Sequence, residues 1–308
     1  MPTDSEPPLS DVDPDSVAPG DVDESAVRAA LASSSPMVRQ RGLELCEALA
    51  EADADAVGLP LDAVASLPDD DNATVGLRAI SVLDAVAEDT PGALDGRLDG
   101  VAAAAGSNIV DVQLTAATLL GKLVVERPAL VAPHVGALVA GLRATEPSED
   151  TEEYAEFVDH PATRQTLVEH DREERERRVS ARRTLANVAV AVTETAPEKA
   201  LDAVDDSGAL VADLGALTDD ADAGVAGAAV DALGHLAATD SDAVDLVADR
   251  LLGALYHDRS FVRARAVQAL GRLGDPDAAP RLSAVAEEDA DEDVREIAAE
   301  TAAFLEAA

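Results

Sequence analysis

Lysine, cysteine and aromatic residues are scarce in this chain of 308 residues, and tryptophan is absent. Only Lys122 and Lys199 carry an ammonium group, and 62 Asp and Glu face 23 Lys and Arg, for a formal net charge of −39. A protein that binds a nucleic-acid backbone needs clustered positive charge. The overall charge therefore argues against a nucleic-acid partner.

The acidic charge is combined with an ordinary apolar content of 47%, so the composition is not that of a disordered chain. An acidic surface almost free of lysine is typical of proteins from extreme halophiles, whose cytoplasm is filled with salt. In molar salt the Debye length falls to about 3 Å, which screens the self-repulsion of such a surface. We therefore expect a protein adapted to high salt.

The single cysteine excludes an internal disulfide. The start, "MPTDSEPPLSDVD", has neither a basic region nor an apolar stretch, so we expect no signal peptide. The longest apolar candidate, "ALVAPHVGALVAGL", is too short to span a membrane and is interrupted by Pro133 and His134. A soluble cytoplasmic protein with no membrane partner is the expectation.

A helical repeat runs through most of the sequence. The segments "VRQRGLELCEAL", "VGLRAISVLDAV", "VQLTAATLLGKL", "VAGAAVDALGHL" and "VRARAVQALGRL" begin at Val38, Val75, Val112, Val225 and Val262. Two further copies begin at Ser180 and Val294. Apolar residues recur five, eight and eleven places after each of these anchor residues, which is the spacing of one helical stripe.

A shorter amphipathic segment ending in turn residues precedes most of the copies, as in "LDAVASLPDDD" and "GALVADLGALTDD". Asp71, Asp222 and Asp258 are candidate N-caps for the longer helices that follow. Because one helix pair cannot bury its own stripe, the pairs must stack. The sequence predicts an all-α fold, a right-handed α-solenoid of about seven helix pairs over residues 23–306, after a disordered acidic tail at residues 1–22.

The residue pattern of the repeat resembles that of HEAT repeats. The segment "RSFVRARAVQALGRLGDPDAAPRL" is especially similar to the phycobilisome-lyase HEAT-like type. In that family an Asp in the turn and an Arg in the second helix link neighbouring units. The resemblance implies such a linking role for Arg41, Arg78, Arg183 and Arg265, three places after their anchors. It implies little about function, because this architecture serves many partners.

The sequence contains no recognisable catalytic constellation. The five histidines are scattered, and His160 and His170 with their neighbouring Asp residues are the one conceivable metal cluster, although zinc sites favour closer spacing and cysteine. Cys46 occupies a position of the apolar stripe, so we interpret it as a buried structural thiol. No phosphate-binding glycine motif is present. We expect no metal, no cofactor and no enzyme activity.

Two enzyme families built on similar helical repeats can be tested by residue. Deoxyhypusine hydroxylase binds its metals through His-Glu pairs, and no histidine here precedes a glutamate. Helical-repeat DNA glycosylases need a basic groove with aromatic stacking, which a chain with no tryptophan and a charge of −39 does not offer. A bilin lyase is suggested by the name of the repeat type alone.

A charged insertion at about residues 145–178 interrupts the repeat. Its first half carries seven acids and no base, whereas seven of the 21 arginines fall between Arg164 and Arg183. One hypothesis is a solvated helix held by i,i+4 ion pairs such as Asp171 with Arg175, Glu173 with Arg177 and Glu174 with Arg178.

The other hypothesis is a docking surface for another protein, which could be acidic. Arginine and aromatic residues are the usual anchors of interfaces. The candidate partner-binding residues are Tyr154, Phe157, Arg172, Arg175, Arg178 and Arg182. The sequence thus favours a non-catalytic scaffold or adaptor for an unidentified protein partner, and the rival is a lyase-type or protein-modification enzyme or accessory factor. The oligomeric state is not predicted.

Overall fold

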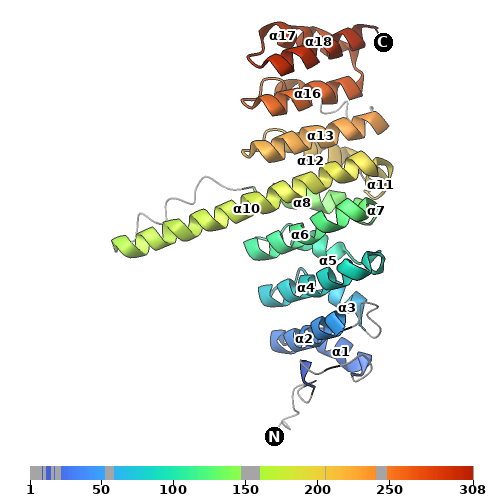
Figure 1. Cartoon of the computed structure of the whole chain (residues 1–308), viewed down its shortest axis with the longest axis vertical. Helices are drawn as coiled ribbons and strands as arrows, with labels where there is room; N and C mark the ends of the chain where they lie inside the picture. Colours follow the sequence, from blue (N-terminus) through green and yellow to red (C-terminus); the bar gives the residue numbers. More distant parts are fainter. Residues whose placement is uncertain are drawn as a thin grey trace. The chain divides into compact units, whose positions relative to one another are not determined.

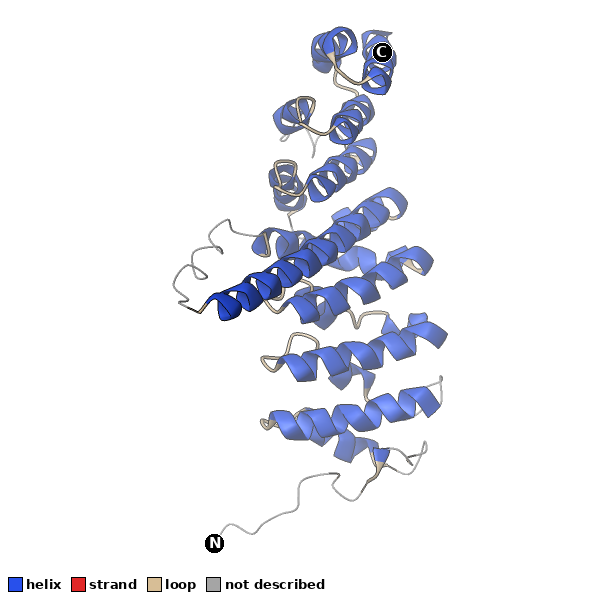
Figure 2. Cartoon of the chain, turned by 60° about the vertical axis from the view of Figure 1, so that its left-hand side comes forward, coloured by secondary structure: helices blue, strands red, loops and turns tan. Residues whose placement is uncertain are grey.

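The computed structural model describes residues 9, 12–14, 17, 22–52, 59–146, 160–204, 206–240 and 248–307. Every regular element within these residues is a helix (Figures 1 and 2). The chain divides into two compact units, residues 1–130 and 131–308. Each unit is a stack of helix pairs in which a shorter first helix is followed by a longer second helix.

The described residues of unit 1 form three pairs. Their helices are α1 (Glu24–Leu31) with α2 (Pro36–Ala52), α3 (Leu61–Ala65) with α4 (Ala73–Asp89), and α5 (Asp99–Ala104) with α6 (Val110–Glu126). The 3-10 helix η2 (Pro91–Leu94) follows α4, and the short α7 (Pro128–Val131) lies at the boundary between the units. The second helices pack in sequence, α2 against α4 and α4 against α6.

In unit 2, the described part of the chain forms four pairs. They are α8 (Val135–Ala144) with α10 (Pro161–Thr195), α12 (Ser207–Leu217) with α13 (Ala223–Thr239), α15 (Ala248–Ala254) with α16 (Ser260–Leu273), and α17 (Ala279–Glu288) with α18 (Glu292–Ala307). Three further short helices are η3 (Ala132–His134), α11 (Pro197–Asp202) and η6 (Pro276–Ala278). The second helices α10, α13, α16 and α18 again pack on one another in order.

The predicted all-α solenoid is confirmed, and the seven anchors fall in the seven second helices of the described residues. The apolar stripe is the core of each unit. Leu43 and Cys46 of α2 are fully buried, as are Leu83 of α4, Leu185 of α10 and Val267 of α16. The core is aliphatic because its helices approach closely through alanine and glycine; a Cβ added at Gly271 of α16 would lie 2.9 Å from a side-chain carbon of Thr301 in α18.

One of the three proposed helix caps is confirmed. Asp222 is the N-cap of α13, and its carboxylate accepts hydrogen bonds from the main-chain N–H groups of Gly224 and Val225. The other two were wrong. Asn72, not Asp71, caps α4, and the N-cap position of α16 is Arg259, one residue after Asp258 and without a side-chain cap. The path of the turn decides which residue takes the N-cap position. The sequence alone does not distinguish between adjacent polar residues.

Among the described residues, three arginine–aspartate pairs with both side chains at most 13% exposed link successive helix pairs across their turns. Arg39 reaches Asp70 at 2.8 Å in unit 1. In unit 2, Arg182 reaches Asp220 at 2.5 Å and Arg263 reaches Asp289 at 2.7 Å. Each of these aspartates also accepts the main-chain N–H of the residue two positions later, which fixes the turn. A charged pair that is hydrogen-bonded in this way is costly to break by removing one partner.

The linking role implied for the anchor-plus-three arginines holds for three of the four. Arg78 of α4 lies 2.9 Å from Glu44 of α2, Arg265 of α16 lies 3.1 Å from Asp231 of α13, and Arg183 of α10 lies 2.7 Å from Asp222. Arg41, in the first pair, instead pairs with Glu44 of its own helix at 3.0 Å.

Candidate docking surface on α10

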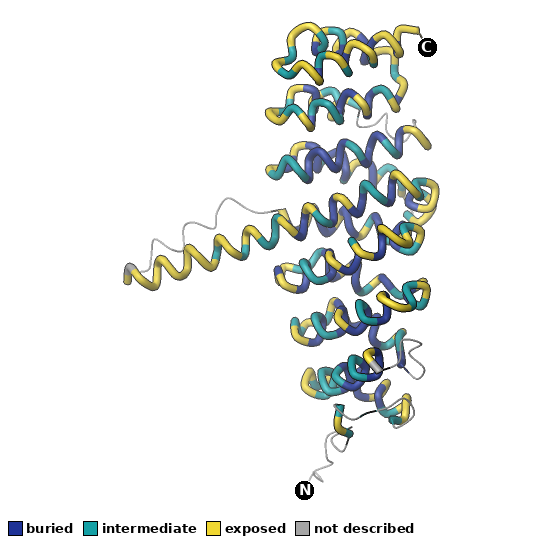
Figure 3. The backbone as a smooth tube through the Cα atoms, viewed as in Figure 1, coloured by how far each residue is buried: buried dark blue, intermediate teal, exposed yellow. Residues whose placement is uncertain are grey.

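The helix α10 is 35 residues long, about twice the length of α13 at 17 residues. Its C-terminal half packs against α8 and α13, and Ala181, Leu185 and Val192 are fully buried there. Its N-terminal half extends beyond the neighbouring helices of unit 2, and residues 162–170 are exposed on every side (Figure 3). The predicted insertion is therefore, from Pro161 onward, an extension of a second helix.

Two apolar side chains are exposed on this extension. Leu167 is 40% exposed and Val168 is 50% exposed. An extension of this length is marginal as an isolated helix in water, because most helical stability in proteins comes from packing. Here the packed half supplies the nucleus on which the exposed half propagates.

One face of α10 continues from the exposed half into the packed half. A hollow of about 590 Å³ runs along this face, and its described lining residues all belong to α10. They follow one stripe of the helix through i,i+3 and i,i+4 relations: Arg172, Arg175, Glu176, Val179, Ser180, Arg183, Thr184 and Asn187. Long arginine side chains thus border a floor of small and β-branched residues.

The arginines of this face differ in how they are paired. Arg172 forms an ion pair with Glu176 at 2.9 Å, but its side chain is 77% exposed. Arg175 makes no ion pair or hydrogen bond among the described residues. Arg178 is closer to the stack: its side chain is 16% exposed and lies 3.8 Å from Glu174. Burial lowers the pKa of Arg178, and the cation of Arg182 acts in the same direction.

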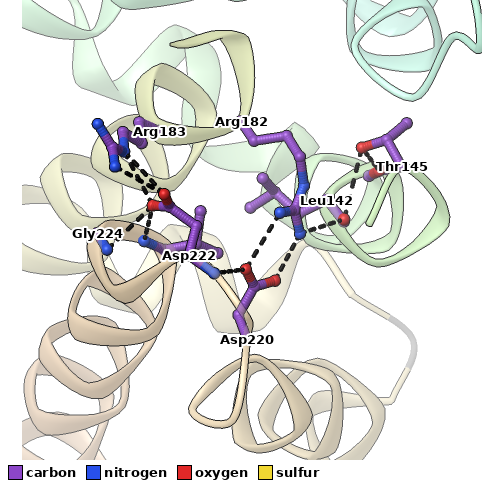
Figure 4. A network of polar contacts seen from close by, with 9 residues as sticks. Leu142, Thr145, Arg182, Arg183, Asp220, Asp222 and Gly224 are labelled. Carbon is purple, nitrogen blue, oxygen red and sulfur yellow. Dashed lines mark hydrogen bonds and ion pairs between the residues drawn. The ribbon is translucent and has the colours of Figure 1, made fainter. Parts of the chain in front are cut away.

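Arg182 does not lie on this exposed face, which corrects its placement among the docking residues. Its side chain is fully buried, and its guanidinium donates two hydrogen bonds to Asp220 and one, of 3.1 Å, to the carbonyl of Leu142 (Figure 4). The helix enters the stack between Val179 and Arg182, so a residue one turn beyond Arg178 is already inside unit 2. The buried pair links α10 to the turn before α13.

The neighbouring Arg183 does lie on the exposed face, and it pairs with Asp222 (Figure 4). The pKa of Arg183 is raised, first by the hydrogen bonds to Asp222 and then by its charge. Partial burial alone would raise the pKa of Asp222, but the hydrogen bonds from Arg183, Val225 and Gly224 together hold it below the ordinary carboxyl value. Asp222 therefore serves as both a helix cap and an anchor for α10.

A signal for the buried pair was present in the sequence. Each turn whose aspartate pairs with an arginine has the sequence Asp-x-Asn or Asp-x-Asp, at residues 70–72, 220–222 and 289–291. The arginine of each pair lies on the second helix that precedes the turn. In two other turns the side chain that accepts the main-chain N–H is Ser107 or His257 instead of an aspartate. In the second helix before each of these turns, the residue after the anchor is Gly76 or Ala226, respectively, and not an arginine.

Of the other candidates, Tyr154 and Phe157 lie outside the described residues. No group of three or more His, Cys, Asp and Glu side chains that could hold a metal occurs within the described part of the chain. Cys46 is buried, and burial raises the pKa of its thiol to about 12, which makes it unreactive. None of the described helices is long and apolar enough to cross a membrane.

The aromatic residues show a pattern that sequence reasoning missed. Tyr256 is 63% exposed, Phe261 is 43% exposed and Phe304 is 60% exposed, so no aromatic side chain of the described residues is buried in the core. Phe261 and Arg265 of α16 lie over Gly227 of α13, where an added Cβ would meet them at 3.0 and 2.9 Å. The second-helix face of unit 2 therefore presents arginine and aromatic groups together.

Comparisons with known proteins agree with this architecture. Residues 211–303, from α12 to α18, match the family of HEAT repeats. Over 93% of this chain and 98% of the other, the structure is similar to an archaeal HEAT-like repeats protein from Thermococcus onnurineus NA1, with 16% sequence identity and a TM-score of 0.50. An engineered protein has 18% identity over 82% of this chain and 96% of its own, with a TM-score of 0.45.

None of the curated proteins matches the sequence. The family match covers residues 211–303 only, and the likeness to the archaeal structure, at 16% identity, concerns the fold alone. Such a fold does not by itself identify a function.

Proposed function

We propose that this protein is a non-catalytic scaffold that captures an acidic protein partner on the exposed half of α10. The observation that carries the proposal is the all-round exposure of residues 162–170, followed by the exposed Arg172 and Arg175 on one face. A helix without a packing partner and with apolar and arginine side chains on it is suited to lie against a second protein.

The pairing of the arginines supports an acidic partner. The chain has 62 acidic residues for 21 arginines, so carboxylates are abundant everywhere on its surface. Arg175 nevertheless has no carboxylate partner among the described residues, and Arg172 has one that is itself 64% exposed. Both guanidinium groups are available to a carboxylate on another molecule.

The energetics require that such contacts be partly removed from water. An exposed ion pair contributes only about 0–1 kcal/mol and is screened by salt. Arginine–carboxylate pairs that are bidentate and desolvated are stronger, and arginine is suited to this geometry. Leu167 and Val168, which are exposed on the same extension, supply apolar area that excludes water around such pairs.

The test is capture of the partner from an extract of the source cells in about 2 M KCl, where nonspecific charge contacts are screened. The double variant Arg172→Glu/Arg175→Glu should abolish capture of the partner. The double variant Leu167→Ala/Val168→Ala should weaken it. Tyr154→Ala and Phe157→Ala should also weaken capture if the aromatic residues of the insertion anchor the same interface.

The matched control is Arg259→Glu with Arg281→Glu, which reverses two exposed arginines elsewhere in unit 2. It should leave capture intact, and circular dichroism should show the same helicity for all variants. Equal recovery of the same partners by the wild-type protein and the α10 charge-reversal variant would refute the proposal, since the arginines would then serve only their own helix.

The setting that we propose is a cytoplasm with molar salt. The support is the composition, with −39 net charge and two lysines. The melting temperature should be much higher in about 2 M than in about 0.1 M KCl, because salt screens the repulsion between carboxylates. Equal melting temperatures in both solutions would contradict this adaptation.

A further inference from the structure

A hollow of about 400 Å³ in unit 2 is lined by the turn between α15 and α16 and by the end of α17 with the turn that follows it. Leu255 and Val285 give it a buried apolar wall. Tyr256, which is 63% exposed, also lines it. An exposed tyrosine ring beside an apolar wall is suited to contact a ligand, because the ring is large and rigid and its face carries partial negative charge.

The arginine in this lining is already matched by a carboxylate. Nε and Nη2 of Arg263 donate to the two carboxylate oxygens of Asp289, each at 2.7 Å. Nη1 donates to the main-chain carbonyls of His257 and Asp258 at 2.8 and 3.3 Å. Four of the five N–H groups of the guanidinium are thus in use, and its side chain is only 13% exposed. The hollow therefore offers little to an acidic ligand.

Two further carboxylates give the hollow a negative charge. Glu288 is exposed and makes no hydrogen bond or ion pair with any residue that the structure describes. Asp258 is also exposed, and its charge acts on Arg263 without a salt bridge between them. Nδ1 of His257 accepts the main-chain N–H of Arg259 at 3.0 Å, so this imidazole adds no positive charge. The charge of the lining therefore favours a cationic ligand.

We propose that this hollow is a binding site for an arginine side chain of a basic partner peptide. The guanidinium stacks on the ring of Tyr256 and pairs with the carboxylate of Glu288, and its aliphatic stem lies against Leu255 and Val285. Charge complementarity and the exposed aromatic ring carry the proposal.

Arginine fits this lining better than lysine does. A guanidinium is planar and weakly hydrated, so it can stack on an aromatic face and pair with a carboxylate at the same time, whereas an ammonium group is a strongly hydrated point charge. The chain forms a contact of this kind within α16, where Cζ of Arg265 lies 5.6 Å from the centre of the Phe261 ring. The proposed contact repeats that arrangement with an arginine from another molecule.

The site is independent of the surface on α10. The exposed Arg172 and Arg175 of α10 are suited to an acidic partner, whereas the hollow is suited to a basic one. One scaffold can thereby hold two partners of opposite charge.

The tyrosine of the hollow supplies its own probe of binding. The chain contains two tyrosines, Tyr154 and Tyr256, and no tryptophan. The variant Tyr154→Phe therefore leaves Tyr256 as the single source of tyrosine fluorescence. This protein is titrated with N-acetyl-arginine amide in about 2 M KCl, where exposed charge contacts are screened. The fluorescence should change to saturation with a dissociation constant on the order of 1–10 mM, as expected for a single side chain.

N-acetyl-citrulline amide is the matched probe, because it keeps the shape of arginine without its charge, and it should give no saturable change. Glu288→Gln should weaken the binding of the arginine probe by at least about fivefold, since it removes a charge-assisted pair. Glu287→Gln changes the adjacent residue, which is exposed and outside the lining, and should alter the affinity by less than about twofold. Ala284→Leu fills the hollow from an exposed position, so it should abolish the response while circular dichroism shows the same helicity.

A Tyr256 fluorescence that does not respond to the arginine probe, or responds equally to citrulline, overturns the proposal. Equal losses for Glu288→Gln and Glu287→Gln overturn it as well, because the probe would then sense only the charge of the surface. A signal that changes with protein concentration before any probe is added would place a second copy of the chain in the hollow and would also overturn it. The double variant Arg172→Glu/Arg175→Glu should leave every result unchanged, so this test and that of the α10 surface fail separately.

Discussion

In the C-terminal half of α10, Leu185 and Val192 are fully buried against the neighbouring helices, whereas residues 162–170 of the N-terminal half are exposed on every side. The two halves share one unbroken helix and differ in what stabilises it. Packing against neighbouring helices stabilises the C-terminal half. Ion pairs along the helix, such as Arg172 with Glu176, stabilise the N-terminal half. A continuous helix can therefore consist of a structural part and a part left available for a partner.

The largest effect is expected at the point where the two halves meet. Arg182→Ala removes one member of a fully buried ion pair and leaves the carboxylate of Asp220 without its partner. The free energy of unfolding should fall by about 3–5 kcal/mol, measured by urea denaturation followed by circular dichroism.

The control for this change is Arg172→Ala in the exposed half, which should alter the unfolding free energy by less than about 0.5 kcal/mol. A double variant, Arg182→Met with Asp220→Leu, should recover much of the loss because no buried charge remains. If Arg182→Ala is as stable as Arg172→Ala, the buried pair does not fix α10 to the turn.

Leucine truncation compares the packing of the two halves directly. Leu185→Ala, at a fully buried position, should cost about 2–5 kcal/mol because it leaves a cavity. Leu167→Ala, at a side chain that is 40% exposed, should change the stability by less than about 0.5 kcal/mol. Similar losses at both positions would show that the N-terminal half is also packed against something in solution.

Acid should weaken the attachment of α10 to α13 through Asp222. Its folded-state pKa is below the ordinary carboxyl value, so its contribution to stability is present above the ordinary carboxyl range and is lost as the pH falls through the folded value. Asp222→Asn keeps a residue that can cap α13 but removes the charge that pairs with Arg183.

At pH 7 this variant should be less stable than the wild-type protein by up to about 1 kcal/mol, since Arg183 is 56% exposed. The difference should narrow as the pH falls from the ordinary carboxyl range through the lowered pKa of Asp222. Thermal melting of both proteins across this pH range is the measurement, and a difference that is independent of pH would show that the ion pair contributes nothing.

The smallest effect concerns the exposed half alone. Glu174→Gln removes the i,i+4 partner of Arg178 and should cost about 0.3–0.5 kcal/mol at low salt. Amide hydrogen exchange in residues 161–178 should quicken while that of residues 180–195 stays the same. In about 2 M KCl the effect should vanish through screening; persistence there would point to packing of Glu174 rather than to its charge.

The repeat could be predicted from sequence because its signal is local. Apolar residues at helical spacing and a turn before each anchor define the pairs, and Val38, Val75 and Val262 fall in second helices as expected. Cys46 was correctly assigned to the core for the same reason. The caps at Asp71 and Asp258 were wrong because a choice between adjacent polar residues depends on the exact path of the turn.

The positions of the candidate docking residues were predicted less well than the fold. Arg172, Arg175, Arg178 and Arg182 share one side of a helix by their spacing, but spacing does not show where that helix enters a stack of neighbours. Arg175 is exposed and Arg182 is fully buried, although two helical turns separate them. Helical periodicity describes only the direction of a side chain around its own axis.

The sequence by itself determined the helix pairs, their apolar stripes and the acidic, lysine-poor surface, because these follow from residue types at fixed local spacing. Only the tertiary structure decided which arginines are buried in ion pairs between helix pairs and which remain exposed on α10. A guanidinium is held inside when a carboxylate and a carbonyl from distant segments, as with Asp220 and Leu142 around Arg182, come within hydrogen-bonding distance. Such convergence is a property of packing between helix pairs, which local spacing does not contain.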